Sequence, residues 1–77
     1  MTMMRTNDLS LATTLSLWLP LEGIERFPNS KKVSFIFTQS IQLDEIVEKY
    51  WKKELRVEPR AFFDQLRANK GRVYDNG

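Results

Sequence analysis

The side chains able to do chemistry are mostly basic, and the groups that many enzymes depend on are missing. The chain of 77 residues contains no His and no Cys, which removes the most common general base and the thiol nucleophile. Three carboxylates, Asp44, Glu45 and Glu48, offer the oxygen ligands that Mg²⁺ prefers. Two of them precede a lysine by four residues, as in the ion pairs of an ordinary helix surface. We therefore expect a non-enzymatic protein with no catalytic residue, metal site or cofactor.

Basic side chains are concentrated in the C-terminal third. Residues 49–72 hold eight basic and three acidic side chains, although the whole chain has a net charge of only +2. Several cations on one surface can contact phosphates and release their counterions, and an aromatic side chain such as Tyr74 can stack on a base. This pattern predicts a nucleic-acid-associated accessory protein that makes non-specific phosphate contacts. The predicted contact residues are Lys49, Lys53, Arg56, Arg60, Arg67 and Lys70. A merely solvated helix face is the alternative interpretation of the same residues.

Large apolar side chains support a second hypothesis, a protein-interaction module. A two-stranded sheet has two unpaired edges and is marginally stable alone, so a second copy or a host protein could add strands to it. In this interpretation Trp18, Phe27 and Ile36 form the interface together with the sheet edge, and the protein is a homo-oligomer or a phage-encoded adaptor or inhibitor. Coverage of the same surface by the first helix of the monomer is the alternative.

Two strands joined by a tight turn are expected over residues 21–27 and 32–38. The turn residues 28–31 include Pro28, which presets its φ angle, and Asn29, whose side chain can bond its own backbone. In the second strand Phe35 and Phe37 share one face with Val33, which predicts the core side of the hairpin. The apolar residues of the run 9–19 fit both the period of a helix and the period of a strand. Asp8 as N-cap and Pro20 as a stop favour a helix there, whereas the alternation of leucines fits a strand.

Two further helices are expected after the hairpin. The first covers residues 39–53, with Ser40 as N-cap and an apolar stripe at helical spacing. The second begins at Pro59 and ends near Gly71. The side chains expected to be buried on these helices are Leu43, Ile46, Val47, Tyr50, Trp51, Phe62, Phe63 and Leu66. The fold class is therefore α+β, in the order α-β-β-α-α: an antiparallel hairpin packed by helices, which a second chain would complete. A single domain is expected over residues 8–72, with flexible ends at 1–7 and 73–77.

Several segments together resemble a known family. They are DLSLA at 8–12, LEGIER at 21–26, VSFIF at 33–37, and the run from EKYWKKEL through RVEPRAFFDQLRANKGRVY at 48–74. Over residues 7–74 the chain resembles a family of uncharacterised small proteins from bacteria and their phages. The resemblance implies the α-β-β-α-α order and a phage or mobile-element context, and it implies no activity. Trp18-Leu19-Pro20 departs from the glycine expected at the exit of the first helix.

The uncharged run 9–21 bears on where in the cell the protein is found. Its 13 residues are too few to cross a bilayer. Asp8 precedes it, and Leu-Pro-Leu-Glu is not a small-residue cleavage site, so a secretion signal is not expected. The sequence therefore predicts a cytoplasmic protein with no membrane partner.

Overall fold

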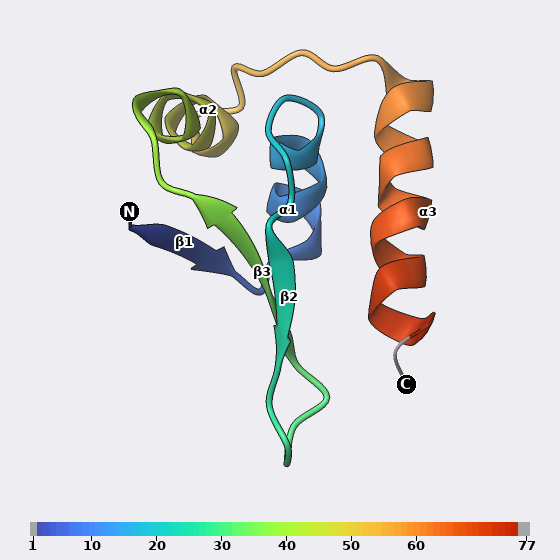
Figure 1. The fold of residues 1–77 in the computed structure, drawn as a ribbon. Helices are drawn as coiled ribbons and strands as arrows, with labels where there is room; N and C mark the ends of the chain where they lie inside the picture. Colours follow the sequence, from blue (N-terminus) through green and yellow to red (C-terminus); the bar gives the residue numbers. More distant parts are fainter. Residues whose placement is uncertain (1, 76–77) are drawn as a thin grey trace.

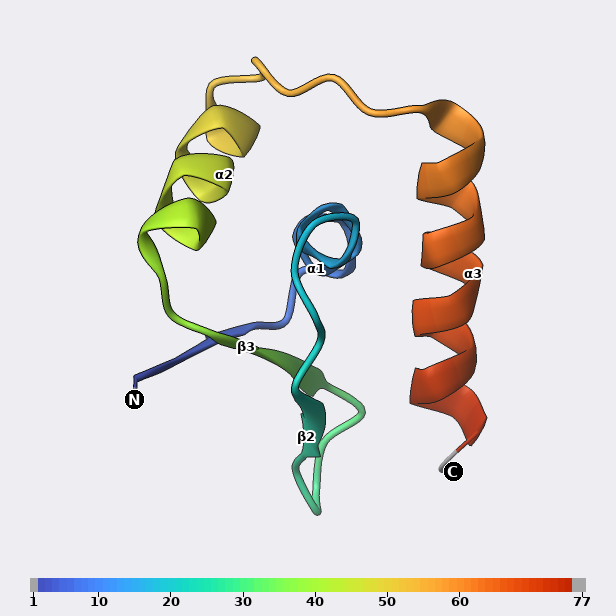
Figure 2. The same ribbon diagram turned by 45° about the horizontal axis from the view of Figure 1, so that its top comes forward.

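The computed structural model describes residues 2–75 and has an α+β fold, as predicted (Figure 1). The elements in chain order are β1 (Met3–Thr6), α1 (Leu9–Ser16), β2 (Gly23–Arg26), β3 (Val33–Thr38), α2 (Ile41–Trp51) and α3 (Pro59–Asp75). The strands form one antiparallel sheet in the order β1-β3-β2. Helix α1 lies between α2 and α3, and Figure 2 shows it nearly end-on in that position.

Strand β1 corrects the predicted two-stranded sheet. Residues 1–7 were expected to be flexible, but Met3–Thr6 pair with β3 in a register from Met3↔Thr38 to Thr6↔Phe35. The other side of β3 pairs with β2 as the predicted hairpin, with Ile24 opposite Phe35. Both edges of β3 are therefore occupied within the chain. Four residues are too few to show an alternating pattern, and only pairing with a strand about thirty residues further along the chain makes them a strand.

Helix α1 resolves the ambiguous run in favour of the helix. The Asp8 carboxylate caps it by accepting the N–H of Leu11 at 3.1 Å. Five consecutive residues, 11–15, are buried, because the sheet, α2 and α3 surround this helix. A helix buried on several sides shows no clean stripe, which explains why its period was ambiguous.

The core joins α1, the sheet and α2. Phe35 and Phe37 are almost fully buried, as predicted, and pack with apolar side chains from the two helices. The buried apolar residues are Leu11, Ala12, Leu15, Phe35, Phe37, Leu43 and Ile46. The Ser40 hydroxyl caps α2 by accepting the N–H of Leu43. The prediction that Trp51 is buried is wrong: it is 63% exposed, because α2 ends there and Lys53, with φ of 61°, turns the chain away.

Helix α3 begins at Pro59 as predicted, and the Glu58 carboxylate accepts the N–H groups of Arg60 and Ala61. Phe63 is 55% exposed, so the prediction that it is buried is wrong. The helix also continues through Gly71, which keeps a negative φ, to Asp75. Residues 73–75 of the predicted flexible tail are therefore helical, and 76–77 lie outside the described residues.

Candidate nucleic-acid interface

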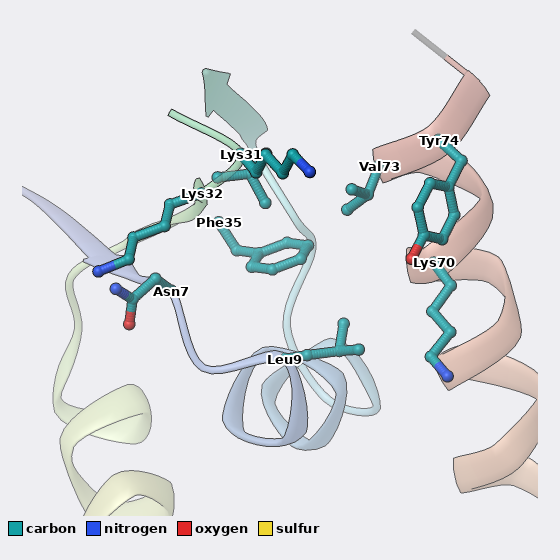
Figure 3. A pocket seen from close by; sticks show the side chains of 9 residues that line it. Asn7, Leu9, Lys31, Lys32, Phe35, Lys70, Val73 and Tyr74 are labelled. Atoms are coloured by element: carbon teal, nitrogen blue, oxygen red, sulfur yellow. The ribbon is translucent and has the colours of Figure 1, made fainter. Parts of the chain in front are cut away.

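A cavity of about 410 Å³ lies between the start of α1, strand β3 and the C-terminal half of α3 (Figure 3). Four apolar side chains line it, from Leu9, Val33, Phe35 and Val73. The polar side chains that line it are those of Asn7, Lys31, Lys32, Lys70 and Tyr74. Its walls are thus apolar, while its polar groups are mainly ammonium groups.

A second hollow, of about 430 Å³, adjoins the first around the loop between β2 and β3. It is lined by Arg26, Phe27, Pro28, Ser30, Lys31, Lys32 and Val33, and shares the last three with the cavity. We call the two hollows together the hairpin site. Among the described residues that line it, four are cationic and none carries a carboxylate. Tyr74 is 76% exposed and Phe27 is 45% exposed, so two aromatic rings stand free beside these cations.

Hydrogen bonds hold the two sides of the hairpin site. The loop closes on itself, because the N–H of Ser30 donates to the carbonyl of Phe27 at 3.2 Å and the N–H of Lys32 donates to the Ser30 hydroxyl at 3.0 Å. The guanidinium of Arg26 donates to the carbonyls of Arg72 and Val73 at the end of α3. Helix ends leave such carbonyls without intrahelical partners and carry a partial negative charge. Arg26 therefore ties the end of α3 to the hairpin and fixes Lys70 and Tyr74 relative to the loop.

The predicted nucleic-acid residues are spread over α2, the linker and α3, and the two helices lie on opposite sides of α1 (Figure 2). Lys70 is the one member of the predicted set among the described residues that line the hairpin site. Lys49 lines a separate hollow of about 280 Å³. Arg67 pairs with Asp64 on the surface of α3. Lys53 and Arg56 belong to the linker, and Arg60 to the first turn of α3. Their role in phosphate binding stays a prediction.

The predicted partner interface is divided among three places. Trp18 follows α1 and Phe27 follows β2, so the two residues lie in loops at opposite ends of β2 (Figure 1). Ile36 is half-buried at the centre of β3, on the sheet face opposite Phe35 and Phe37. On that same face the Arg5 guanidinium and the Glu25 carboxylate pair at 3.3 Å across β3. An ion pair beside Ile36 makes this face less apolar than the sequence suggested.

Two of the three acidic residues of α2 bond to side chains next to the ends of the helix. Glu48 accepts a hydrogen bond from the Lys52 ammonium at 2.8 Å, and this bond together with the lysine charge lowers the pKa of Glu48. Asp44 accepts a hydrogen bond from the Gln39 amide. Within residues 2–75, no three carboxylates come together as a metal site would require.

The sequence analysis missed Arg26, Lys31 and Lys32. Residues 1–40 hold four basic and three acidic side chains, so the charge excess of the C-terminal third does not point to this segment. A local signal existed, since two adjacent lysines follow the turn that begins with Phe27 and Pro28. An exposed loop with neighbouring cations and an aromatic ring could have been identified from that signal alone.

In the part of the chain that the structure describes, no helix is both long and apolar enough to cross a bilayer. Comparisons with protein-family models, curated proteins and solved structures gave no match.

Proposed function

We propose that the protein is a nucleic-acid-binding module that contacts the phosphate backbone through the hairpin site. The observation that carries the proposal is the meeting of Arg26, Lys31, Lys32 and Lys70 around two adjoining hollows, with no carboxylate among the described lining residues. Cations gathered without competing acids favour a polyanion, because each phosphate contact releases condensed counterions. The exposed rings of Phe27 and Tyr74 add surfaces on which bases can stack.

The number of cations sets the expected salt dependence. Arg26 is bonded to the carbonyls of Arg72 and Val73, which leaves the three lysines to contact phosphates. The slope of log K against log salt is then about −2 for a single strand and nearly −3 for a duplex. Binding should therefore be strong at low salt and fall steeply with added salt. Fluorescence anisotropy of labelled oligonucleotides across a salt series measures both quantities.

Two charge-reversal variants locate the binding surface. Lys31→Glu with Lys32→Glu changes the hairpin site, and Lys49→Glu with Lys53→Glu changes the end of α2. Each pair shifts the net charge from +2 to −2, so the long-range electrostatic effect is matched. We expect the first pair to weaken binding at least about tenfold more than the second and to reduce the salt slope by about two. Equal losses, or a greater loss at α2, would place binding elsewhere, and no binding at low salt would refute the function.

Self-association is a second candidate, favoured by the exposed aromatic residue beside α2. Trp18 is 44% exposed and lines a hollow with Ile46 and Leu55, and tryptophan is enriched among residues that dominate interfaces. Light scattering after size exclusion, over a concentration series, measures the molar mass. A dimer that Trp18→Ala returns to a monomer would support this function. A monomer of 9.1 kDa at every concentration would exclude it.

A further inference from the structure

The cavity of the hairpin site has a shape and lining that phosphate contacts alone do not explain. Its volume of about 410 Å³ falls in the range of about 300–1,000 Å³ typical of small-ligand pockets, and the hollow is open to solvent on one side. Leu9, Val33 and Val73 are half-buried and turn apolar surface toward it. A site for phosphate alone needs only polar donors, so the apolar walls indicate that the occupant has an apolar part.

The charged groups stand around these walls. Figure 3 shows Lys31 extending from the β2–β3 loop toward Val73, Lys32 extending from the same loop toward Asn7, and Lys70 on α3, on the other side of the cavity. The occupant is therefore an amphipathic anion, with a flat or apolar body inside and negative charge at the rim. A nucleotide has this chemistry, since its base has two apolar faces and its phosphates are anionic.

We propose that the cavity receives one unstacked base of a single-stranded nucleic acid, so that the module prefers single strands to duplexes. This inference rests on the proposed function. In a duplex the bases are stacked and paired, and only their edges are open in the grooves, whereas an unpaired base can turn out of the strand and enter a pocket. The flanking phosphates then lie at the lysines.

Tyr74 and Asn7 have distinct places in this arrangement. Phe35 is almost fully buried and shapes the floor, whereas Tyr74 is largely exposed beside the cavity and has a ring face free for stacking. The Asn7 amide lies beside Lys32, on the side of Phe35 away from Tyr74 (Figure 3), so stacking on Tyr74 rather than this amide holds the base. Stacking without hydrogen bonds to base edges gives tolerance of sequence, as in other single-strand sites.

Three probes of equal length test the preference. They are a labelled single strand, the blunt duplex of the same sequence, and a strand of the same length in which every nucleotide is abasic. All three present phosphates, and the duplex has the highest charge density, so a purely electrostatic surface binds the duplex at least as tightly. We expect the single strand to bind at least about tenfold tighter than either of the others at one salt concentration. Comparable binding of all three would overturn the inference and leave the proposed function standing, and no binding of any probe would overturn both.

Substitutions on α3 test the stacking residue. Tyr74→Ala should weaken binding of the single strand by at least about fivefold and leave binding of the abasic strand unchanged. Tyr74→Phe keeps the ring and should retain binding. Phe63→Ala is the matched control, because Phe63 is an exposed aromatic residue of the same helix that does not line the hairpin site. Equal effects of Tyr74→Ala and Phe63→Ala, or an equal loss for the abasic strand, would refute the assignment.

The free nucleotide and the fatty acid anion are the other amphipathic anions to compare. Competition with a mononucleotide and with a medium-chain fatty acid, against the labelled single strand, separates them from the polymer. Weak competition by the mononucleotide, with no effect of the fatty acid, is the result expected for one base of a strand. Displacement by the fatty acid at a lower concentration than by the mononucleotide would overturn the inference.

Discussion

Replacement of Asn69 by alanine should loosen α3 from the rest of the protein. Among the residues of α3 whose burial is described, 59–74, Asn69 alone is fully buried. Its amide nitrogen donates to the hydroxyl of Thr13 in α1 at 3.4 Å, and its amide oxygen accepts from Gln65 at 3.2 Å. Thr13 is also fully buried. A polar contact thus stands at the centre of the α1–α3 packing.

The magnitude follows from burial and geometry. A buried polar group that loses its partner costs about 1–3 kcal/mol. The bond to Thr13 is longer than the usual 2.9–3.0 Å, so the free-energy cost of losing this bond lies at the low end of that range. The void left by the removed side chain adds a further cost. We expect Asn69→Ala to lower the free energy of unfolding by about 2 kcal/mol. For a domain of this size that corresponds to a fall in Tm of roughly 8–16 °C.

Thermal and urea unfolding followed by circular dichroism measure this loss. Arg67→Ala is the control on the same helix, because its pair with Asp64 is exposed and such pairs contribute about 0–1 kcal/mol. A double-mutant cycle with Thr13→Val isolates the contact itself, with an expected coupling of at least about 0.5 kcal/mol. A loss below about 0.5 kcal/mol in Asn69→Ala would show that the polar contact does not hold α3, and the reasoning would be wrong.

Three other substitutions have expected outcomes. Asp8→Ala removes the α1 cap and should lower the free energy of unfolding by about 1 kcal/mol in urea, whereas Asp8→Ser should restore most of it. Gly23→Thr should raise that free energy by about 0.5–1 kcal/mol, because an added Cβ meets no atom within 4 Å and the new side chain faces Ile36 across the strands; a lower urea midpoint would contradict this. Lys52 lowers the pKa of Glu48 below 4.5, so Lys52→Met should raise that pKa in an NMR titration. The pair stabilises the fold above pH 4.5 and stops doing so as the pH falls through the lowered pKa of Glu48.

Local chemistry allowed the helix starts to be predicted. Asp8, Ser40 and Pro59 each act within three residues of their own position, by accepting a backbone N–H or by fixing φ. The alternation in β3 was equally local, since Phe35 and Phe37 share a face whatever covers it. Such short-range patterns were sufficient to predict the α+β fold class, which the structure confirms.

The features that were missed depend on distant contacts. Strand β1 exists because β3 pairs with it. Gly71 was expected to end α3, but the residues after it have their own contacts: Val73 packs against the core, and Arg26 binds the carbonyls at the end of the helix. Trp51 and Phe63 fit apolar stripes by spacing, yet α2 ends at Trp51. On α3, Phe62 and Leu66 of the predicted stripe are half-buried, whereas Phe63 is exposed. Local propensity cannot predict contacts between distant segments. The carbonyls that Arg26 binds, for example, lie more than forty residues further along the chain.

The meeting of the loop lysines with Lys70 was missed for the same reason. Lys31 and Lys32 meet Lys70 only because α3 folds back beside the hairpin. The predicted charge surface took its members from one stretch of the sequence, and the fold then placed that stretch on both sides of α1. Of its members, Lys70 lines the hairpin site together with Lys31 and Lys32 of the β2–β3 loop.

The way α3 packs explains why the cavity is open. On the other side of α1, helix α2 buries Leu43 and Ile46 and closes the core. In its C-terminal half, helix α3 instead contributes a buried asparagine, a half-buried valine and a hydrogen-bonded end. A helix held in this way does not bring large apolar side chains down onto Leu9 and Val33, so part of their surface stays uncovered, at a cost in burial of about 25 cal/mol per Å². In the proposed complex, the base would cover this apolar surface and the flanking phosphates would lie near the three lysines that line the cavity.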